Sequence, residues 1–330
     1  MSDRPPSAEP APTETILFLL IPDFSMIAFT SAIEPLRIAN RLSGRRLYAW
    51  RLLSRDGGAV AASNGIAIQV ESAIATAEPP ATGTPPSVVL CGGLGSEHYQ
   101  SKEVFAWLRR WGRRGAPIGA LCTGAHVLAR AGLLDRHRCT IHWENLPGFM
   151  EAFPDIPVTS DLYEIDGHRF TCSGGTAALD LMLHRIALAH GDELATKVSE
   201  QCIVDRIRGP HDRQRMPLRL RLGVHHPKLI NAVEIMEGNI EEPLSQESLA
   251  DRIQLSRRQL ERLFRRHLGR TPAQFYLETR LERARHLLFQ TDMPIMSVAC
   301  ATGFVSASHF TTCYRQMFGK TPRAERVRVA

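Results

Sequence analysis

Residues 256–272 and 306–322 are two copies of one element, 50 residues apart. When they are aligned without a gap, their apolar positions coincide at spacings of three and four, which mark one buried face of a helix. Ser256 begins a predicted capping box, and Gly269 and Gly319 predict the two helix ends. The repeat therefore predicts two similar amphipathic helices. Their apolar residues are Leu260, Leu263, Phe264 and Leu268 in the first copy and Phe310, Cys313, Tyr314 and Phe318 in the second.

A short helix-like segment and a tight turn precede each copy, so the pattern predicts two helix-turn-helix motifs, at about 246–267 and 294–317. The second helix of such a motif enters the major groove of DNA, where its outward side chains reach base edges and phosphates. The predicted DNA-binding residues are Arg257, Arg258, Glu261, Arg262, Arg265, Ser306, Ala307, Ser308, Thr311, Thr312 and Arg315.

Residues 272–290, between the two copies, predict one long helix with Thr271 as its N-cap and Pro272 at its first position. At ~1.5 Å per residue such a helix is roughly 27 Å long. Successive turns of one DNA groove are ~34 Å apart. A spacer of this length could hold both recognition helices against one face of a bent duplex.

The pattern GF-x-S-x-S-HF-x-x-x-Y-R-x-x-FGKTP at 303–322 resembles the DNA-binding domain of AraC/XylS-type transcription regulators. This resemblance covers about the last hundred residues and implies double-stranded promoter DNA as a partner, with RNA polymerase as a second partner of an activator. The charge distribution agrees with it. Residues 227–330 hold 16 basic and 11 acidic side chains, whereas residues 1–226 hold 24 and 23. The positive excess lies where DNA binding is predicted.

The first 190 residues alternate strand-like and helix-like segments, which predicts an α/β sandwich of the flavodoxin-like class with helices on both faces of its sheet. The predicted strands are Ile16–Ile21, Trp50–Ser54, Val88–Cys91 and Pro117–Leu121. The predicted helices are Ile27–Leu42, Lys102–Arg113, Ala125–Ala131 and Ala177–His190, with a further helix near 192–207. An Asp166-Gly167 turn predicts a hairpin.

A chain of 330 residues has room for two domains. The expected parts are a disordered tail at 1–14, an α/β ligand-sensing domain at 15–208, a linker at 209–226 and an all-α DNA-binding domain at 227–328. The apolar run from Ile16 is broken by Pro22 after six residues, too soon for a membrane span. Seven scattered cysteines form no Cys-x-x-Cys pair, which disfavours disulfides and zinc. We therefore expect a cytoplasmic protein without metal or cofactor.

Small molecules bind at the carboxyl ends of the strands in open α/β sheets, so residues that follow the predicted strands are candidates for a binding site. Cys122 lies in a small-residue turn between a strand and a helix, where free N–H groups would lower the pKa of its thiol. This turn has the look of a nucleophile elbow. The candidate effector-binding residues are Asp23, Glu34, Gly92, Gly93, Cys122, Thr123, His142, Trp143 and Ser173.

The elbow at Cys122 resembles that of the PfpI-like branch of the class I glutamine amidotransferase-like superfamily. Joined to an AraC-type domain, it makes residues 15–328 similar to GlxA-family transcription regulators. The chain resembles regulators of glycine betaine and carnitine catabolism in four stretches, FSMIAFTSAIEPLRIANRLSG, GALCTGA, CTIHWE and FTCSGGTA. The same stretches are compatible with regulators of other amines and of arginine. The resemblance implies an amine or quaternary ammonium effector, for which Trp143 offers an aromatic face.

An enzyme and a sensor are both conceivable at this site. In an enzyme Cys122 would be the nucleophile and His142 its base or hydrogen-bond partner. The resemblance places the acid near the start of the first helix, where an ungapped count falls on Ala28, and Asp23 or Glu34 would substitute only if the turn differs.

Thr123 stands where peptidase-like members carry a histidine after their cysteine. We therefore expect no catalytic residue, and we predict a homodimeric activator of amine catabolism genes that responds to a small metabolite. Two alternatives stay open. The first alternative is a cysteine-dependent hydrolase or amidotransferase that carries a DNA-targeting module. The second is a constitutive regulator whose first domain only dimerises.

Overall fold

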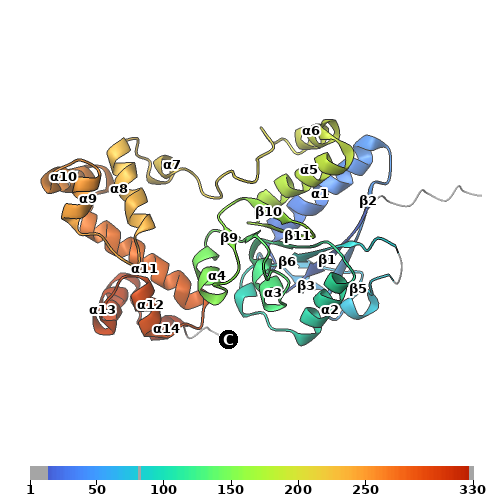
Figure 1. The fold of residues 1–330 in the computed structure, drawn as a ribbon, viewed down its shortest axis with the longest axis horizontal. Helices are drawn as coiled ribbons and strands as arrows, with labels where there is room; N and C mark the ends of the chain where they lie inside the picture. The colour runs from blue at the N-terminus through green and yellow to red at the C-terminus, as the bar shows by residue number, and fades with distance from the viewer. Residues whose placement is uncertain (1–13, 81–82, 327–330) are drawn as a thin grey trace, which may run out of the picture. The chain divides into compact units, whose positions relative to one another are not determined.

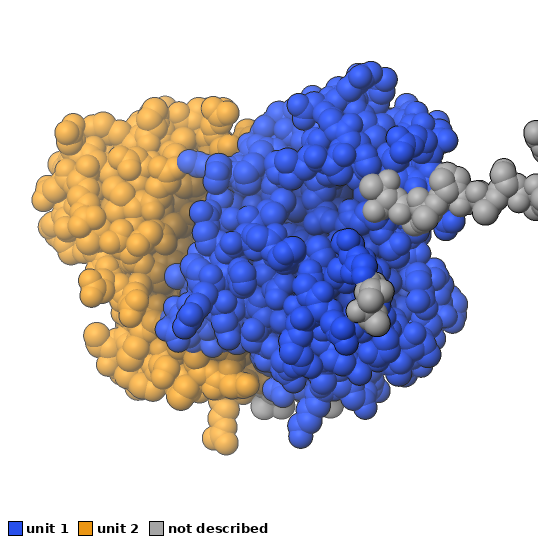
Figure 2. All heavy atoms as spheres, turned by 45° about the vertical axis from the view of Figure 1, so that its right-hand side comes forward, with its two compact units in different colours: residues 1–214 blue, residues 215–330 orange. Residues whose placement is uncertain are grey.

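The computed structural model describes residues 14–80 and 83–326 and divides into two compact units, Met1–Gln214 and Arg215–Ala330, which Figure 2 colours separately. The tail predicted at 1–14 lies outside the described residues except for Glu14, which begins the first strand. The division falls within the predicted linker at 209–226. The second half of that segment is not a plain connector, because a short helix within it packs Leu218 into the core of the second unit.

The first unit contains one large sheet and two small strand pairs. The strands of the large sheet are β1 (Glu14–Leu20), β2 (Tyr48–Ser54), β5 (Ser72–Ala73), β6 (Ser87–Cys91), β7 (Ile118–Leu121), β10 (Tyr163–Asp166) and β11 (Arg169–Cys172). Their order is β10-β11-β7-β6-β1-β2-β5, and neighbours run parallel except in the β10–β11 hairpin. The small pairs are β3 (Val60–Ala61) with β4 (Ala67–Ile68) and β8 (Cys139–Thr140) with β9 (Val158–Thr159).

Helices cover both faces of the large sheet (Figure 1). The α-helices of the first unit are α1 (Met26–Ser43), α2 (Lys102–Arg113), α3 (Ala125–Arg130), α4 (Leu146–Ala152), α5 (Ala177–His190) and α6 (Asp192–Gln201). Three 3-10 turns are η1 (Ile74–Thr76), η2 (Ser96–His98) and η3 (Cys122–Gly124). Local signals set the helix ends. The Oγ of Ser25 accepts a hydrogen bond from the N–H of Ala28 at 3.4 Å, and α1 ends at Gly44, whose φ is 63°.

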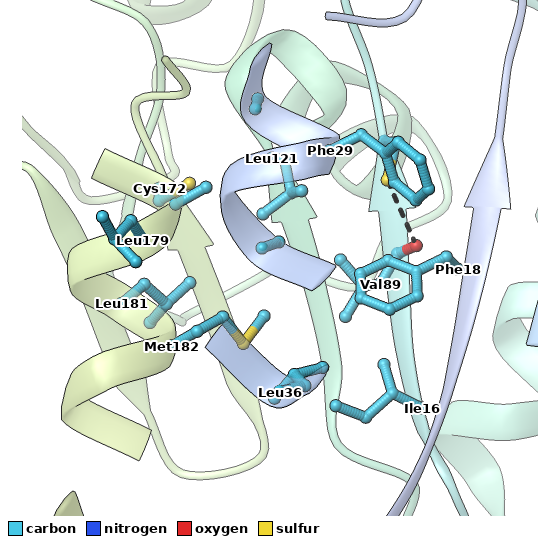
Figure 3. Packing of buried hydrophobic residues seen from close by; sticks show 14 of the residues in the cluster. Ile16, Phe18, Phe29, Leu36, Val89, Leu121, Cys172, Leu179, Leu181 and Met182 are labelled. Atoms are coloured by element: carbon cyan, nitrogen blue, oxygen red, sulfur yellow. Dashed lines mark hydrogen bonds between the residues drawn. The ribbon is translucent and has the colours of Figure 1, made fainter. Parts of the chain in front are cut away.

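Each face of the sheet carries its own core, because alternate residues of a strand point to opposite faces. Ile16 and Phe18 of β1 pack in the cluster that includes residues of α1, α5 and α6. Figure 3 shows this cluster, with Phe29 and Leu36 of α1 lying over the strands. Leu17 belongs to the second cluster, under α2 and α3. The parallel strands are thereby packed on both faces of the sheet up to their carboxyl ends.

The structure confirms the predicted α/β class of this unit. The four predicted strands and four predicted helices are present with ends that differ by at most two residues, and the hairpin is present, with Asp166 paired to Arg169. The helix expected near 192–207 ends earlier, at Gln201. The short strands β3, β4, β5, β8 and β9 were not predicted, because two residues are too few to show the alternation of a strand.

The second unit is all-helical, as predicted. Its helices are α7 (Leu218–Leu222), α8 (Pro227–Gly238), α9 (Gln246–Arg252), α10 (Arg257–Leu268), α11 (Pro272–Gln290), α12 (Ile295–Ala301), α13 (Ala307–Phe318) and α14 (Pro322–Arg326). One core lies among α7 to α10, and another lies among α11 to α13. Helix α11 contributes to both. Within the described residues of the whole chain, no helix combines the length and apolarity needed to cross a bilayer.

Candidate functional site

Helix α10 presents the first set of predicted DNA-binding residues. It starts at a capping box between Ser256 and Gln259, and the chain leaves it through Gly269 at a φ of 68°. Leu260 and Phe264 are fully buried, which fixes the orientation of the helix. The predicted contact residues lie on the other side: Arg257, Arg258, Arg262 and Arg265 are exposed, and Glu261 is half-buried.

Two of these four arginines form ion pairs within the unit. Arg257 lies 2.8 Å from a carboxylate oxygen of Glu247, and Arg265 lies 3.1 Å from one of Glu261. Arg258 and Arg262 form no ion pair with any residue that the structure describes. A guanidinium carries several N–H donors in a planar fork that suits guanine edges and phosphates. The two unpaired groups are therefore the best placed to bind DNA without breaking an existing contact.

Helix α13 presents a weaker and less charged surface. Its N-cap is Ser306, whose Oγ accepts a hydrogen bond from the N–H of His309 at 3.4 Å, and it ends at Gly319. Phe310 and Tyr314 are fully buried. Of the predicted contact residues, Ala307, Ser308, Thr312 and Arg315 are exposed, whereas Ser306 and Thr311 are half-buried.

The turns of the two motifs differ by one residue. Four residues separate α9 from α10, and five separate α12 from α13. In the first turn the N–H of Leu255 donates to the carbonyl of Ala250 at 3.0 Å, and in the second the N–H of Phe304 donates to that of Ala299 at 2.9 Å. Leu255 and Phe304 are therefore equivalent, and the additional residue of the second turn is Val305, whose side chain is 95% exposed.

Helix α11 is fastened to both motifs. At 19 residues it is ~28 Å long. The hydroxyl of Tyr276 donates to the carbonyl of Asn239 beside the first motif. The guanidinium of Arg280 donates to the carbonyls of Thr302 and Gly303 in the second turn, at 2.7 Å each. The predicted spacer helix thus also holds the segment that precedes the first motif and the turn of the second motif.

The carboxyl ends of four strands lie side by side in the first unit. The register pairs Leu20 of β1 with Cys91 of β6, Cys91 with Leu121 of β7, and Leu121 with Cys172 of β11. The loops that follow these strands contain most of the candidate effector-binding residues. The sheet thus brings together segments that are far apart in the sequence, as predicted.

Gly92 and Gly93 allow these loops to touch. A Cβ on Gly93 would lie 2.0 Å from the carbonyl oxygen of Asp23, and a Cβ on Gly92 would lie 2.3 Å from the nitrogen of Gly124. The sequence predicted both glycines to be effector-binding residues. In the structure they let one loop approach another, so their role in shaping the site is indirect.

Cys122 sits in a strained turn between β7 and α3. Its φ is 58°, a left-handed conformation that few residues other than glycine adopt. A Cβ on Gly174 would lie 2.9 Å from the Cys122 Sγ, so the loop after β11 covers the thiol. The neighbouring Thr123 donates its hydroxyl to the carbonyl of Gly93 and lies 3.1 Å from the Oγ of Ser96. The loop at Gly174 and the hydrogen bonds of Thr123 together hold the turn in place.

The predicted lowering of the Cys122 pKa is wrong. Burial of the thiol raises its pKa from 9.0 to about 11, although hydrogen bonding to the backbone and side chain of Thr123 acts in the opposite direction. The negative charge of Glu144 adds to the increase. Thr123 and Gly124, the other two residues of η3, also separate Cys122 from Ala125, the first residue of α3. Desolvation outweighs the hydrogen bonds, and the thiol is protonated at neutral pH.

His142 and Trp143 follow β8 and are half-buried, with ring centroids 5.5 Å apart. A carboxylate oxygen of Glu144 lies 3.9 Å from the Nδ1 of His142. Burial lowers the pKa of His142, and the charge of Glu144 opposes this shift. Within the described part of the chain, no hydrogen bond joins Cys122 to His142. Cys122 and His142 are therefore not joined by the hydrogen bond through which a base activates a cysteine nucleophile.

The remaining candidates occupy different environments. Asp23 is exposed, with a φ of 59°, and its N–H donates to the carbonyl of Ala61 at 2.9 Å. Ser173 is buried, and its N–H donates to the carbonyl of Leu162 at 2.8 Å. Glu34 is exposed on α1 and accepts two hydrogen bonds from Arg37, at 2.8 and 2.6 Å. No hydrogen bond or ion pair among the described residues brings Glu34 to the strand ends, so its predicted place in the site is not supported.

Sequence reasoning missed three residues at this site. Gly174 covers the Cys122 thiol, Glu144 influences the pKa of Cys122, and Ser96 accepts a hydrogen bond from the N–H of Gly93 at 2.9 Å. The Gly-Gly pair directly after Ser173 was a signal for the first, and the position of Glu144 beside Trp143 was a signal for the second. Among the described residues, no group of three His, Cys, Asp or Glu side chains could hold a metal ion.

Known proteins resemble this chain along both units. A model described as the DJ-1/PfpI family matches residues 14–187, and one described as a helix-turn-helix domain matches residues 249–328. The HTH-type transcriptional regulator GbdR of Pseudomonas aeruginosa (strain UCBPP-PA14) is 48% identical over 95% of this chain and 84% of its own length. The HTH-type transcriptional regulator GlxA of Rhizobium meliloti (strain 1021) is 38% identical over 98% of each chain.

A solved structure agrees with these matches. The crystal structure of an AraC family transcriptional regulator from Pseudomonas putida matches with a TM-score of 0.50 and 29% identity, over 57% of this chain and 99% of that one. The exposed arginines of α10 and the paired helix-turn-helix motifs fit the same family. This chain therefore belongs to the AraC-type transcriptional regulators that carry a DJ-1/PfpI domain, and it binds double-stranded DNA.

Proposed function

We propose that this regulator senses a small amine-derived metabolite at the strand ends of its first unit and thereby changes the affinity of α10 and α13 for promoter DNA. The main support is the environment of Cys122. Its backbone is strained, Gly174 covers its thiol, and burial keeps that thiol protonated. A group in this state can line a binding site, whereas a nucleophile must be a thiolate.

We propose further that the first unit is not catalytic. A thiol with a pKa of about 11 is ionised to only about one part in 10,000 at pH 7, and His142 is not hydrogen-bonded to it within the described residues. The strained φ of Cys122 favours the rival hydrolase, because nucleophile elbows share this feature. Release of product from amide and ester substrates distinguishes the two: we expect none above the blank, and turnover that Cys122→Ser abolishes would establish an enzyme.

The proposed effector is a quaternary ammonium compound. The resemblance to regulators of glycine betaine and carnitine catabolism supports this class, and so does the half-buried ring of Trp143 beside that of His142. An aromatic face binds such a cation with ~0.5–2 kcal/mol. The nearby carboxylate of Glu144, 3.9 Å from His142, would add an opposite charge.

Calorimetry tests the effector. Titration of the full-length protein with glycine betaine, dimethylglycine and carnitine should give micromolar to millimolar binding, which Trp143→Ala weakens. Trp143→Phe is the matched control, because it keeps an aromatic face and should retain most of the affinity. Binding of arginine or another amino acid, together with no heat from any quaternary amine, would eliminate the proposed class.

We also propose that the regulator is a cytoplasmic homodimer that activates transcription through contact with RNA polymerase. Paired promoter half-sites favour a dimer, and a promoter-binding protein acts where the chromosome lies. Sedimentation would give the oligomeric state. If the effector leaves the affinity for promoter DNA unchanged, the first unit only dimerises the chain, and the sensor proposal fails.

A further inference from the structure

Val305 has the highest exposed fraction among the large apolar side chains of the described residues, at 95%. Single exposed apolar residues are common on protein surfaces, so exposure alone means little. The position of Val305 is the informative feature, because it directly precedes Ser306, the N-cap of α13. In helix-turn-helix proteins the N-terminal residues of the second helix contact the base edges.

Contacts on both sides hold this residue outward. Phe304 is buried, with the guanidinium of Arg280 4.3 Å from its ring centroid. The same guanidinium donates hydrogen bonds to the two residues before Phe304. On the other side, Ser306 is engaged as the N-cap by the N–H of His309. With its neighbours fixed in this way, the additional residue of the second turn presents an apolar group at the start of the recognition helix.

The surface of α13 suits an apolar contact better than the surface of α10 does. The exposed residues that follow Val305 are Ala307, Ser308 and His309, and the guanidinium of Arg315 lies more than two turns of helix later. In the major groove the apolar feature of a base pair is the 5-methyl group of thymine. A small apolar side chain can distinguish thymine from other bases by covering that methyl group.

We propose that Val305 contacts the 5-methyl group of a thymine in the half-site bound by the second motif. This motif then selects thymine through an apolar contact, whereas the first motif binds bases through Arg258 and Arg262. The inference rests on DNA binding by α13 and does not depend on the effector or on the state of Cys122.

Replacement of thymine by deoxyuridine removes only the methyl group, and it therefore tests the contact directly. The operator is first selected from random DNA with the full-length protein, and each thymine is then replaced singly. We expect one replacement to weaken wild-type binding by about fourfold, the effect of about one buried methyl group. The same replacement should leave binding of Val305→Ala unchanged, so that the two changes are not additive.

Two control variants accompany this test. Leu188→Ala removes an apolar side chain of α5 that is 71% exposed and should respond to deoxyuridine as the wild type does. Arg258→Ala should bind more weakly overall and still show the fourfold effect. Equal deoxyuridine profiles for Val305→Ala and wild type would overturn the proposal, as would a uniform loss of affinity for all DNA in Val305→Ala. Failure of the wild type to select any operator would instead contradict sequence-specific DNA binding.

Discussion

The two units carry their functional groups in opposite environments. Arg258 and Arg262 of the second unit project into solvent from a helix with ordinary caps and an ordinary apolar face. Cys122 and Thr123 of the first unit lie in a turn that other loops cover, and His126 of the following helix is 1% exposed. An exposed group keeps the chemistry of its residue type. A buried group takes its chemistry from what packs around it.

We expect the two units to differ in how well they tolerate substitutions. In the second unit the two turns differ in length and the two recognition helices differ in charge, yet both keep their caps and their buried faces. In the first unit several strand-end loops meet within contact distance, so we expect them to tolerate few substitutions. The following predictions test this difference, from the largest expected effect to the smallest.

The largest effect is expected for Gly93→Ala in the first unit. The added Cβ would lie 2.0 Å from the carbonyl of Asp23, so a loop must move, and the free energy of unfolding should fall by ~3 kcal/mol or more. All four tryptophans lie at or before residue 143, so urea unfolding followed by tryptophan fluorescence reports on this unit alone. Gly58→Ala is the control, because its Cβ would meet only the side chain of Asp56, at 3.3 Å. Equal stability of the two variants would show that the strand-end loops accommodate the added methyl group and are not tightly packed.

The next effect concerns DNA affinity. Arg258→Ala and Arg262→Ala should each cost ~1–3 kcal/mol and relax sequence preference, because these guanidiniums have no ion-pair partner among the described residues and can reach base edges. Arg257→Ala is the matched control with a smaller expected loss, since Glu247 already holds that group. The measurement is fluorescence anisotropy with labelled operator and non-operator DNA. Unchanged operator affinity in both variants would contradict the assignment.

Arg315→Ala should differ from these variants in kind. Its place late in α13 favours phosphate over base contact, so binding to all sequences should weaken and the salt slope should fall by about 1. A change confined to one operator sequence would show instead that Arg315 contacts a base. The comparison thus tests whether the arginines of α10 contact bases while that of α13 contacts phosphate.

The sequence predicted the second unit more accurately than the functional site of the first unit. Helix ends and apolar faces of the second unit are local properties, and the predicted helix at 272–290 matches α11 in both ends. The additional residue Val305 was not apparent, because an ungapped repeat aligns the helices and says nothing about which turn residue is extra. The shift of the Cys122 pKa was predicted with the wrong sign, since its cause is burial by loops that are distant in sequence. Glu34 was assigned to the effector site from its position in the chain alone. Its side chain instead pairs with Arg37 on α1, and the sequence does not show the direction of that side chain.

A smaller effect is expected from mild acidification in the first unit. Burial, together with the charges of Arg130 and His98, lowers the pKa of His126 from 6.5 to about 3. Below pH 6.5 the unfolded chain binds a proton that the folded chain does not, so stability is complete above pH 6.5 and is lost as the pH falls toward 3, with a loss of ~1 kcal/mol between pH 6.5 and pH 5.5. His126→Leu should flatten this part of the profile in urea unfolding followed by tryptophan fluorescence. An unchanged slope would mean that other groups cause the acid sensitivity.

The smallest effect is expected for Cys122→Ser, which exchanges one small, half-buried residue for another at the centre of the proposed sensor. Since the wild-type thiol is already protonated, the substitution removes no charge, and DNA affinity without effector should stay within about twofold of the wild type. The serine hydroxyl is smaller and more polar than the thiol under the cover of Gly174, so the change in DNA affinity caused by the effector should be altered. Cys300→Ser is the control, because that cysteine is exposed in the second unit and should leave the response intact. A normal effector response in Cys122→Ser would show that the metabolite binds elsewhere. That result would leave the assignment of the DNA-binding surface unaffected.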